Sequence, residues 1–467
     1  MRQTLHTSPA IGLDFGTTNS SLALVREDGR VELASFSFQG AATQSFRSVL
    51  YLEQVKRAGG VKQITSAKHI TSKTGPAAIE AYLEAEDKGR LVQSLKSYLP
   101  NRNLTGTEVF GRRYTLEELV SRMLADLRSH AEEQFGVPVR HATAGRPVRF
   151  VGSNGEEDDA YAESRLREAF LLAGFESIEF EMEPVGAAYA YESTLDHDEL
   201  ILIGDFGGGT SDFSLLHVGP GVRQRGRRQQ SMLGNSGGAG AGEYSGGQRQ
   251  QGLLGNSGVG LAGDAFDARI VRKLVSPALG SESLARSLNK TLPAVPAWIY
   301  TNLERWHYLS FLRTRNVSEI LKSARMRALE PEKIEALTTL VEEDLGYQLH
   351  QAVQKVKYEL SRADAAEFRF REGGLDLRIP VTRAEFEGWI GDELAQIEEC
   401  VDSLLADTGV KPEKVNRVFL TGGTSLVPAV RRIFASRFGE ERIRSGSEFT
   451  SVAHGLALRA AESGAGR

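Results

Sequence analysis

The sequence is poor in cysteine, has no long apolar run and carries little net charge. Its single cysteine, Cys400, excludes an internal disulfide and a cysteine-based metal cluster. No apolar run approaches the roughly 20 residues that a membrane-spanning helix needs. The net charge of −5 and the lack of basic clusters with interleaved aromatic residues argue against nucleic-acid binding. The first ten residues are polar and lead directly into a strand, so we expect no signal peptide and a cytoplasmic location.

The residues that are present fit a folded protein of several domains. Hydrophobic residues make up 40% and charged residues 25% of the chain, a balance typical of globular proteins. The length of 467 residues is enough for about two to four domains.

A glycine-rich stretch at residues 201–212 carries the strongest chemical pattern. An apolar run ends at Asp205, and Phe206, three glycines and Thr210 follow. This order predicts a buried strand and a sharp turn. Successive glycines let backbone N–H groups point into one concavity, which is a common way to cradle phosphate oxygens. An acid at the end of the strand can meet a hydrated metal ion there. Taken alone, the stretch is equally compatible with a plain glycine-rich turn.

Residues 11–24 repeat the same order, with Asp14, Phe15 and Gly16 between two apolar runs. Two such hairpins about 190 residues apart suggest a pseudo-duplicated protein. Each half then presents one phosphate loop to a shared cleft. A third stretch, residues 417–428, again reads as a strand followed by a Gly-Gly turn, and the helix behind it can receive a nucleotide at its N-terminus.

Helices and one insertion account for most of the remaining chain. Capping boxes at Thr115 and Thr382 each predict a helix start, and an apolar stripe predicts one long helix over residues 331–360. Residues 223–258 are rich in Gly, Gln, Arg and Ser and are expected to be mobile. They contain a tandem repeat, residues 233–237 and 254–258. Since only the second copy runs into a helix, we expect it to hold the structural position.

The motifs, in this order, resemble the actin-like ATPase superfamily. Within it they are most similar to the ATPase domain of the DnaK-type heat-shock-70 chaperones, and to its YegD-like subgroup. The matching segments are the first phosphate motif (14–20), the catalytic lysine segment (95–96), the Glu-Pro-Thr-Ala-Ala-Ala segment (183–188), the second phosphate motif (205–210), the Gly-Gly-Glu-Asp-Phe-Asp segment (262–267), the Lys-x-x-Leu-Ser helix (355–361) and the adenosine motif (420–425). The resemblance implies an α/β, two-lobed actin-like ATPase fold with duplicated ribonuclease-H-like subdomains.

The resemblance also implies a site for ATP or ADP with Mg²⁺ between the lobes. It makes Asp14 and Asp205 the metal anchors, and Lys96, Glu183 and Asp205 the catalytic group that orients the attacking water. The residues that it implies for nucleotide binding are Gly16, Thr17, Thr18, Asn19, Gly207, Gly208, Gly209, Thr210, Gly263, Asp264, Lys357, Ser361, Gly422, Gly423 and Thr424.

Plainer interpretations of these residues stay open at the level of the sequence. Asp14 and Asp205 can be turn acids, and Lys96 a surface lysine. Glu183 can be an acid that favours a helix start. Lys357 and Ser361 can be ordinary helix residues. Two departures from the family pattern are Leu426 and Tyr358, which stand where basic residues are usual.

The expected domain organisation follows the same resemblance. Lobe I is expected at residues 1–194 (core 1–40 and 105–194, small subdomain 41–104), and lobe II at 195–467 (core 195–222 and 363–467, helical subdomain 259–362, insertion 223–258). We expect the family's peptide-binding domain to be absent, because only about 45 residues follow Gly423 and no acidic-hydrophobic linker appears.

The expected function is a slow ATPase that works as a chaperone-like switch. Its expected partners are ATP and either protein partners or unfolded clients, with no nucleic acid and no membrane, and we expect a monomer. Two alternatives within the superfamily are a small-molecule kinase and a filament-forming scaffold.

Overall fold

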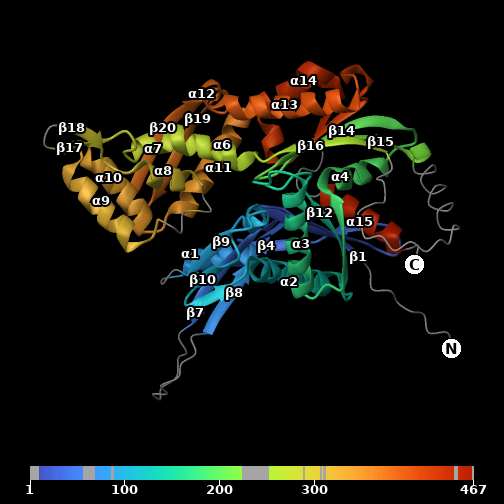
Figure 1. Cartoon of the computed structure of the whole chain (residues 1–467), viewed down its shortest axis with the longest axis horizontal. Helices are drawn as coiled ribbons and strands as arrows, with labels where there is room; N and C mark the ends of the chain where they lie inside the picture. The colour runs from blue at the N-terminus through green and yellow to red at the C-terminus, as the bar shows by residue number, and fades with distance from the viewer. Residues whose placement is uncertain are drawn as a thin grey trace, which may run out of the picture. The chain divides into compact units, whose positions relative to one another are not determined.

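The computed structural model describes residues 10–55, 69–85, 89–222, 252–287, 290–305, 308, 312–445 and 451–464. Figure 1 shows the chain coloured from its blue N-terminus to its red C-terminus. The chain divides into two compact units. The first is Met1–Gly260 with Ile397–Gly423 and Ile433–Arg467, and the second is Leu261–Gln396 with Thr424–Arg432.

Two sheets of the same topology form the framework of the first unit. The first has the strand order β3–β2–β1–β12–β13, and the second has the order β16–β15–β14–β21–β22. In both, the first three strands pair antiparallel and the last two join in parallel. The bounds are β1 Ala10–Phe15, β2 Asn19–Val25, β3 Val31–Leu33, β12 His141–Arg146, β13 Ser177–Met182, β14 Glu199–Phe206, β15 Ser211–Val218, β16 Leu253–Val259, β21 Arg417–Thr421 and β22 Ile443–Ser445. The repeated topology agrees with the duplication that the two hairpin motifs suggest.

Smaller strands and helices complete the first unit, and one of these strands, β6, pairs with β2 of the first sheet. The small strands are β4 Phe36–Phe38, β5 Ala41–Thr43, β6 Phe46–Arg47, β7 Val49–Val55, β8 His69–Thr74, β9 Arg90–Gln93, β10 Thr107–Val109 and β11 Arg112–Tyr114. The helices are α1 Gly75–Glu84, η1 Leu95–Tyr98, α2 Leu116–Phe135, α3 Glu156–Leu172, α4 Glu183–Glu192, η4 Pro412–Lys414, η6 Glu440–Arg442 and α15 Ser451–Gly464. The capping box predicted at Thr115 is present at the start of α2, and Gly136 closes that helix with a φ of 70°.

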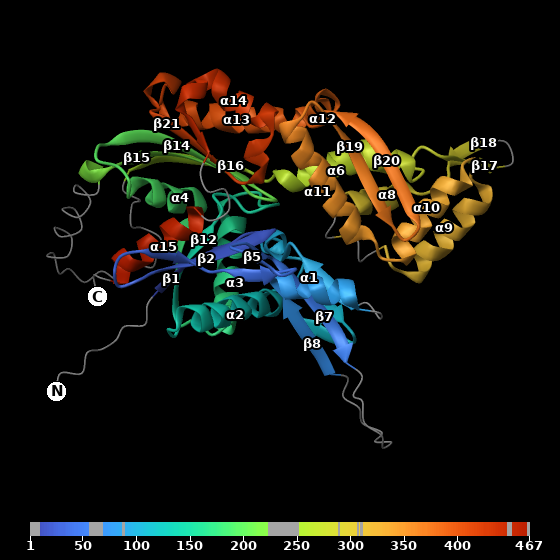
Figure 2. The ribbon, with the colours of Figure 1, turned by 180° about the vertical axis from the view of Figure 1, so that it is seen from behind.

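Helices α4 and α15 lie between the two sheets, as Figures 1 and 2 both show. Helix α15 packs on β1 and β2, α4 packs on β14 and β15, and the two helices pack on each other. Glycines make this close approach possible: a Cβ on Gly455 would lie 1.7 Å from the carbonyl O of Gly186, and one on Gly12 would lie 2.1 Å from the amide N of Ala457. The far side of the first sheet buries its apolar face against α2 and α3, which includes Leu13, Leu124 and Phe170.

The second unit is mainly helical. Its elements are α6 Gly263–Ile270, the π-helical turn η2 Val271–Val275, α7 Ser276–Ala278, β17 Leu284–Ser287, β18 Lys290–Pro293, α8 Ala297–Glu304, α9 Arg315–Arg327, α10 Pro331–Glu342, α11 Gly346–Arg362, β19 Ala365–Glu372, β20 Leu375–Thr382 and α12 Arg383–Trp389. The capping box predicted at Thr382 is present at the start of α12. Three further elements contain residues of both units: α13 Gly391–Thr408, η5 Gly423–Leu426 and α14 Pro428–Phe438.

Two local expectations are revised by these elements. The single helix predicted over residues 331–360 is wrong: α10 and α11 are separate, because Asp344 takes a φ of 56° between them. The second copy of the tandem repeat forms β16, so regular structure resumes before the expected end of the insertion at residue 258. The first copy, residues 233–237, lies outside the part of the chain that the structure describes.

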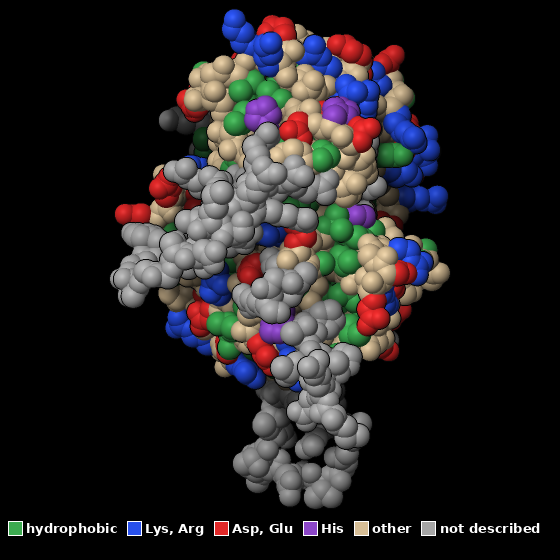
Figure 3. All heavy atoms as spheres, turned by 90° about the vertical axis from the view of Figure 1, so that its right-hand side faces the viewer, with side chains coloured by type: hydrophobic (Ala, Val, Ile, Leu, Met, Phe, Trp, Pro, Cys, Tyr) green, Lys and Arg blue, Asp and Glu red, His purple; other side chains and the backbone are tan. Residues whose placement is uncertain are grey.

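No helix in the described ranges combines the length and apolar character that crossing a bilayer requires. On the face shown in Figure 3, acidic, basic and hydrophobic side chains are interspersed.

Candidate active site

The first glycine motif is the tight turn that joins β1 to β2. Asp14 pairs with Ser21 across this hairpin. The turn needs glycine at residue 16, since a Cβ there would lie 2.1 Å from the carbonyl O of Asn19. Thr18 is buried, and among the described residues its Oγ1 has no hydrogen-bond partner. A buried hydroxyl without a partner is costly, so this loop is suited to an oxygen-rich ligand that accepts its proton.

The second glycine motif is the turn that joins β14 to β15. Asp205 and Asp212 face each other across that hairpin, and the amide N–H of Gly207 donates to the carbonyl O of Thr210 at 2.9 Å. Gly208 lies inside this turn. A Cβ on Gly209 would lie 2.8 Å from Val151 Cγ2, 3.6 Å from Thr17 Oγ1 and 3.7 Å from Ser97 Oγ. The two glycine loops and the segment that carries Lys96 therefore meet at one place in the first unit.

Lys96 and Glu183 form a buried ion pair at this meeting point. Lys96 lies on η1 and Glu183 is the first residue of α4. Nζ donates to Oε1 of Glu183 at 2.6 Å, and only 4% of the Lys96 surface and 7% of the Glu183 surface are exposed. Solvent screens the attraction in an exposed ion pair, so such a pair stabilises little. A buried pair is screened much less, so the lysine is held in one position and its charge acts strongly on nearby groups. Lys96 is therefore not a surface lysine, and its catalytic role stays a prediction.

Acids outnumber bases in this cluster. Burial, followed by repulsion from Glu183, raises the pKa of Asp205 to about 6. Burial and repulsion from Glu183 and Asp205 also raise the pKa of Asp14 well above its usual range, although Lys96 opposes the shift. Burial, followed by repulsion from Glu183, also raises the pKa of Asp212 well above its usual range. Carboxyls with raised pKa values in one place mark a site that is short of positive charge.

The donor set fits a hydrated magnesium ion. The residues that the structure describes contain no group of three or more His, Cys, Asp or Glu side chains arranged to enclose a metal ion. Mg²⁺ usually takes one or two carboxylates, keeps several waters and uses phosphate oxygens for the rest. Asp14 and Asp205 supply two carboxylates, and the excess of negative charge around them favours a divalent cation.

Three residues that the sequence did not single out support this cluster. The hydroxyl of Thr421 donates to Asp205 Oδ1 at 2.5 Å, and that of Ser48 donates to the carbonyl O of Gly16 at 2.7 Å. Asp212 Oδ1 accepts from the backbone N–H groups of Val148 at 3.0 Å and of Arg149 at 3.3 Å. Thr421 and Asp212 belong to the glycine motifs, so strand pairing could have indicated them. Ser48 has no comparable local signal.

The third glycine motif follows β21. Gly422 has a φ of 82°, and a Cβ there would lie 1.9 Å from the carbonyl O of Phe206, so only glycine fits this close approach. Strand β21 runs parallel to β14 and pairs Thr421 with Asp205. Gly422 and Gly423 thus follow directly on a residue that contacts the acidic cluster.

The other predicted nucleotide contacts lie in the second unit. Lys357 Nζ is 2.6 Å from Asp267 Oδ1 and donates to the carbonyl O of Gly263 at 3.3 Å. Asp264 follows at the start of α6. The hydroxyl of Ser361 donates to the carbonyl O of Tyr358 within α11, and Thr424 is buried. Within this unit, the structure therefore brings Lys357 together with Gly263 and gives Ser361 a local helix bond.

A family model described as Hsp70 protein matches residues 10–227 and 333–464. The matched ranges contain all the predicted site residues except Gly263 and Asp264. The chain is 26% identical over 462 residues to "Chaperone protein DnaK" of Thermosipho africanus. The aligned region covers 97% of this chain and 58% of that relative. It is 24% identical over 456 residues to the protein of that name from Thermotoga maritima, which covers 97% of this chain and 59% of the relative. The chain thus spans less than two thirds of the length of these relatives.

Proposed function

Since this chain belongs to the Hsp70 protein family, we propose that it binds ATP with Mg²⁺ and hydrolyses ATP slowly to ADP and phosphate. The observation that carries the proposal is the buried Lys96–Glu183 ion pair, which lies where the two glycine hairpins meet. A lone glycine turn could serve many ligands, but two of them beside a buried lysine are suited to a polyphosphate.

In this proposal the loops bind and the side chains of the cluster act. Backbone N–H groups of residues 16–18 and 207–210 hold the β- and γ-phosphates, and the free Thr18 hydroxyl donates to a phosphate oxygen. Asp14 and Asp205 would hold a Mg²⁺ ion. When bound, Mg²⁺ offsets negative charge on the phosphates.

The reaction is a transfer of the γ-phosphoryl group to water. Glu183 and Asp205 accept hydrogen bonds from the attacking water and orient it, and Lys96 stabilises charge that develops on the γ-phosphoryl oxygens. The water oxygen forms a bond to the γ-phosphorus, and the bond from that phosphorus to the β,γ-bridging oxygen breaks. The electron pair leaves with ADP, and the protons of the water remain on phosphate and solvent.

Slow hydrolysis suits a switch better than a metabolic enzyme. We propose that these 467 residues report the nucleotide state to protein partners or to unfolded clients. The proposal takes its support from the family and from the names of the relatives, which call them chaperones.

The test is phosphate release from ATP by the purified chain, with and without Mg²⁺. Lys96→Ala should retain ATP binding and lose hydrolysis, because the loops are untouched and the cation that stabilises the reacting group is gone. Lys322→Ala, which removes an exposed lysine of α9, is the matched control and should keep wild-type turnover. Equal turnover in Lys96→Ala and wild type would refute the assignment. Transfer of phosphate to a sugar or another acceptor instead of water would favour a kinase.

A further inference from the structure

A buried arginine outside the acidic cluster forms hydrogen bonds with the segment of chain that follows Lys96. Arg165 lies on α3, and 5% of its side chain is exposed. Its Nε donates to Glu117 Oε1 at the start of α2. The rest of the guanidinium donates to backbone carbonyls: Nη1 to Leu99 at 3.2 Å and to Asn101 at 3.3 Å, and Nη2 to Leu104 at 3.1 Å. The planar fork of one side chain thus joins one carboxylate and three carbonyls.

Those three carbonyls belong to residues 99–104, the segment that follows η1 in the chain. The amide N–H of Leu99 donates to the carbonyl O of Lys96 at 3.2 Å, and that of Asn101 donates to the carbonyl O of Tyr98 at 3.0 Å. Leu99 is fully buried. The first carbonyl that Arg165 binds, that of Leu99, therefore lies three residues after Lys96. One hydrogen bond joins the amide of Leu99 to the backbone of Lys96.

The other end of η1 is held in an uncommon backbone conformation. Ser94 has a φ of 54° and a ψ of 30°, which lie in the left-handed region, and it is buried. Residues other than glycine seldom adopt this conformation unless their surroundings impose it. Since η1 has a single short turn between Ser94 and Leu99, it needs tertiary restraints to stay in place.

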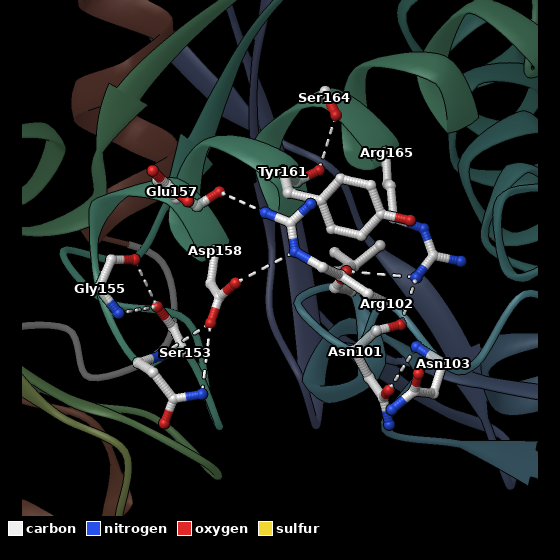
Figure 4. Close-up of polar contacts among 12 residues, drawn as sticks. Asn101, Arg102, Asn103, Ser153, Gly155, Glu157, Asp158, Tyr161, Ser164 and Arg165 are labelled. Carbon is white, nitrogen blue, oxygen red and sulfur yellow. Dashed lines mark hydrogen bonds and ion pairs between the residues drawn. The ribbon is translucent and has the colours of Figure 1, made fainter.

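A second arginine, Arg102, belongs to the same segment and contacts α3 at the surface. Figure 4 shows Arg102 stacked on the ring of Tyr161 and directed to Asp158 and Glu157 on α3. Its guanidinium lies 4.6 Å from the centre of that ring, and Nε is 3.4 Å from Asp158 Oδ1. More than half of the Arg102 side chain is exposed, so its contacts with α3 are weak compared with the hydrogen bonds of the buried Arg165.

We infer that Arg165 is a positioning residue for Lys96: by binding the carbonyls of Leu99, Asn101 and Leu104, it fixes η1 and so holds Nζ at Glu183. The inference rests on the proposed ATPase function. These four hydrogen bonds require an arginine at the buried position. A lysine is a point charge without the planar fork that joins three carbonyls and a carboxylate, and an apolar residue removes all four of these hydrogen bonds.

The test measures single-turnover ATP hydrolysis and ATP affinity in Arg165→Lys and Arg165→Met. A displacement of about 1 Å at a reacting group can cost about 100-fold in rate. We therefore expect hydrolysis to fall about 10-fold in Arg165→Lys and about 100-fold in Arg165→Met, with ATP affinity changed by less than about 3-fold. Arg167→Lys is the control, because Arg167 lies on the same helix and donates to Ile178 rather than to the 99–104 segment. Arg102→Ala should lower the rate by less than about 2-fold.

A double-mutant cycle separates positioning from general stability. If Arg165 acts through Lys96, then Arg165→Lys should have no further effect on the residual rate of hydrolysis that a long single-turnover time course measures in the Lys96→Ala background. Equal fold-losses in both backgrounds, or unchanged hydrolysis in Arg165→Lys, would overturn the inference. Should Arg165→Met fail to fold, hydrogen exchange of Arg165→Lys decides: peptides over residues 94–104 should exchange faster than in wild type, and unchanged exchange contradicts the inference. A wild-type chain without ATPase activity would instead refute the proposed function itself.

Discussion

Replacing Asp205 by asparagine should make the ligand-free protein more stable and the enzyme inactive. Asparagine has nearly the same shape, and its Oδ1 can still accept the hydrogen bond that Thr421 donates at 2.5 Å. The change removes a negative charge from a cluster where burial and Glu183 raise the pKa of Asp205 to about 6.

The size of the effect follows from the two pKa values. An unfolded aspartate has a pKa of about 3.9, and the rise of that pKa to about 6 in the folded protein corresponds to about 3 kcal/mol. Because the folded pKa is raised, the favourable contribution of Asp205 is complete only below pH 4 and is lost as the pH rises through 6. Asparagine does not ionise. We therefore expect Asp205→Asn to gain about 1–2 kcal/mol of unfolding free energy at pH 5 and about 3 kcal/mol at pH 8.

Urea unfolding at pH 5, 6, 7 and 8 without Mg²⁺ or nucleotide measures this gain, and phosphate release with Mg²⁺ measures the loss of function. The control is Asp376→Asn, an exposed acid of the β19–β20 hairpin whose pKa is lowered by the hydrogen bond from Arg378. That variant should gain nothing at pH 8. A variant at Asp205 that is no more stable than wild type at pH 8 would contradict the reasoning, as would unchanged Mg²⁺-dependent turnover.

Two further predictions concern the packing and the second unit. Gly455→Ala should lower the unfolding free energy by about 1–3 kcal/mol, because its Cβ meets the backbone of Gly186. Gly388 has open space around it, so Gly388→Ala should not lower the unfolding free energy. Denaturant titration of both variants compares the two effects. Burial lowers the pKa of His350 to about 4, so its contribution to stability is complete above pH 6.5 and is lost as the pH falls toward 4. His350→Gln should therefore unfold with a weaker pH dependence over this range; an unchanged dependence would contradict the assignment to His350.

The sequence was most informative where a residue type is forced by backbone geometry. The glycine turns predicted at 16 and 422 are needed for close approaches of 2.1 and 1.9 Å to neighbouring carbonyls. The predicted α/β fold of the actin-like ATPase type is confirmed by the family match, and both sheets share one strand order. Local signals of this kind report on the chain within a few residues, so they transfer directly to the structure.

Residues that act across the fold were harder to predict. The stripe over residues 331–360 keeps helical spacing through the break at Asp344, because the residues on both sides are buried: Leu337 and Val341 before it, and Leu349 and Val353 after it. Spacing alone could not reveal the interruption. Arg165 and Ser48 gain their roles from partners more than 30 residues away in the chain. Nothing in their own neighbourhood in the sequence marks them.

A single-turnover assay of ATP hydrolysis with Mg²⁺, with ATP binding measured in parallel on the same samples, tests whether Lys96 takes part in the reaction. We expect wild type to convert bound ATP to ADP and phosphate slowly, while Lys96→Ala binds ATP with similar affinity and keeps at most a small residual rate of hydrolysis. Hydrolysis by Lys96→Ala at the wild-type rate would contradict the assignment of the buried Lys96–Glu183 pair to the reaction.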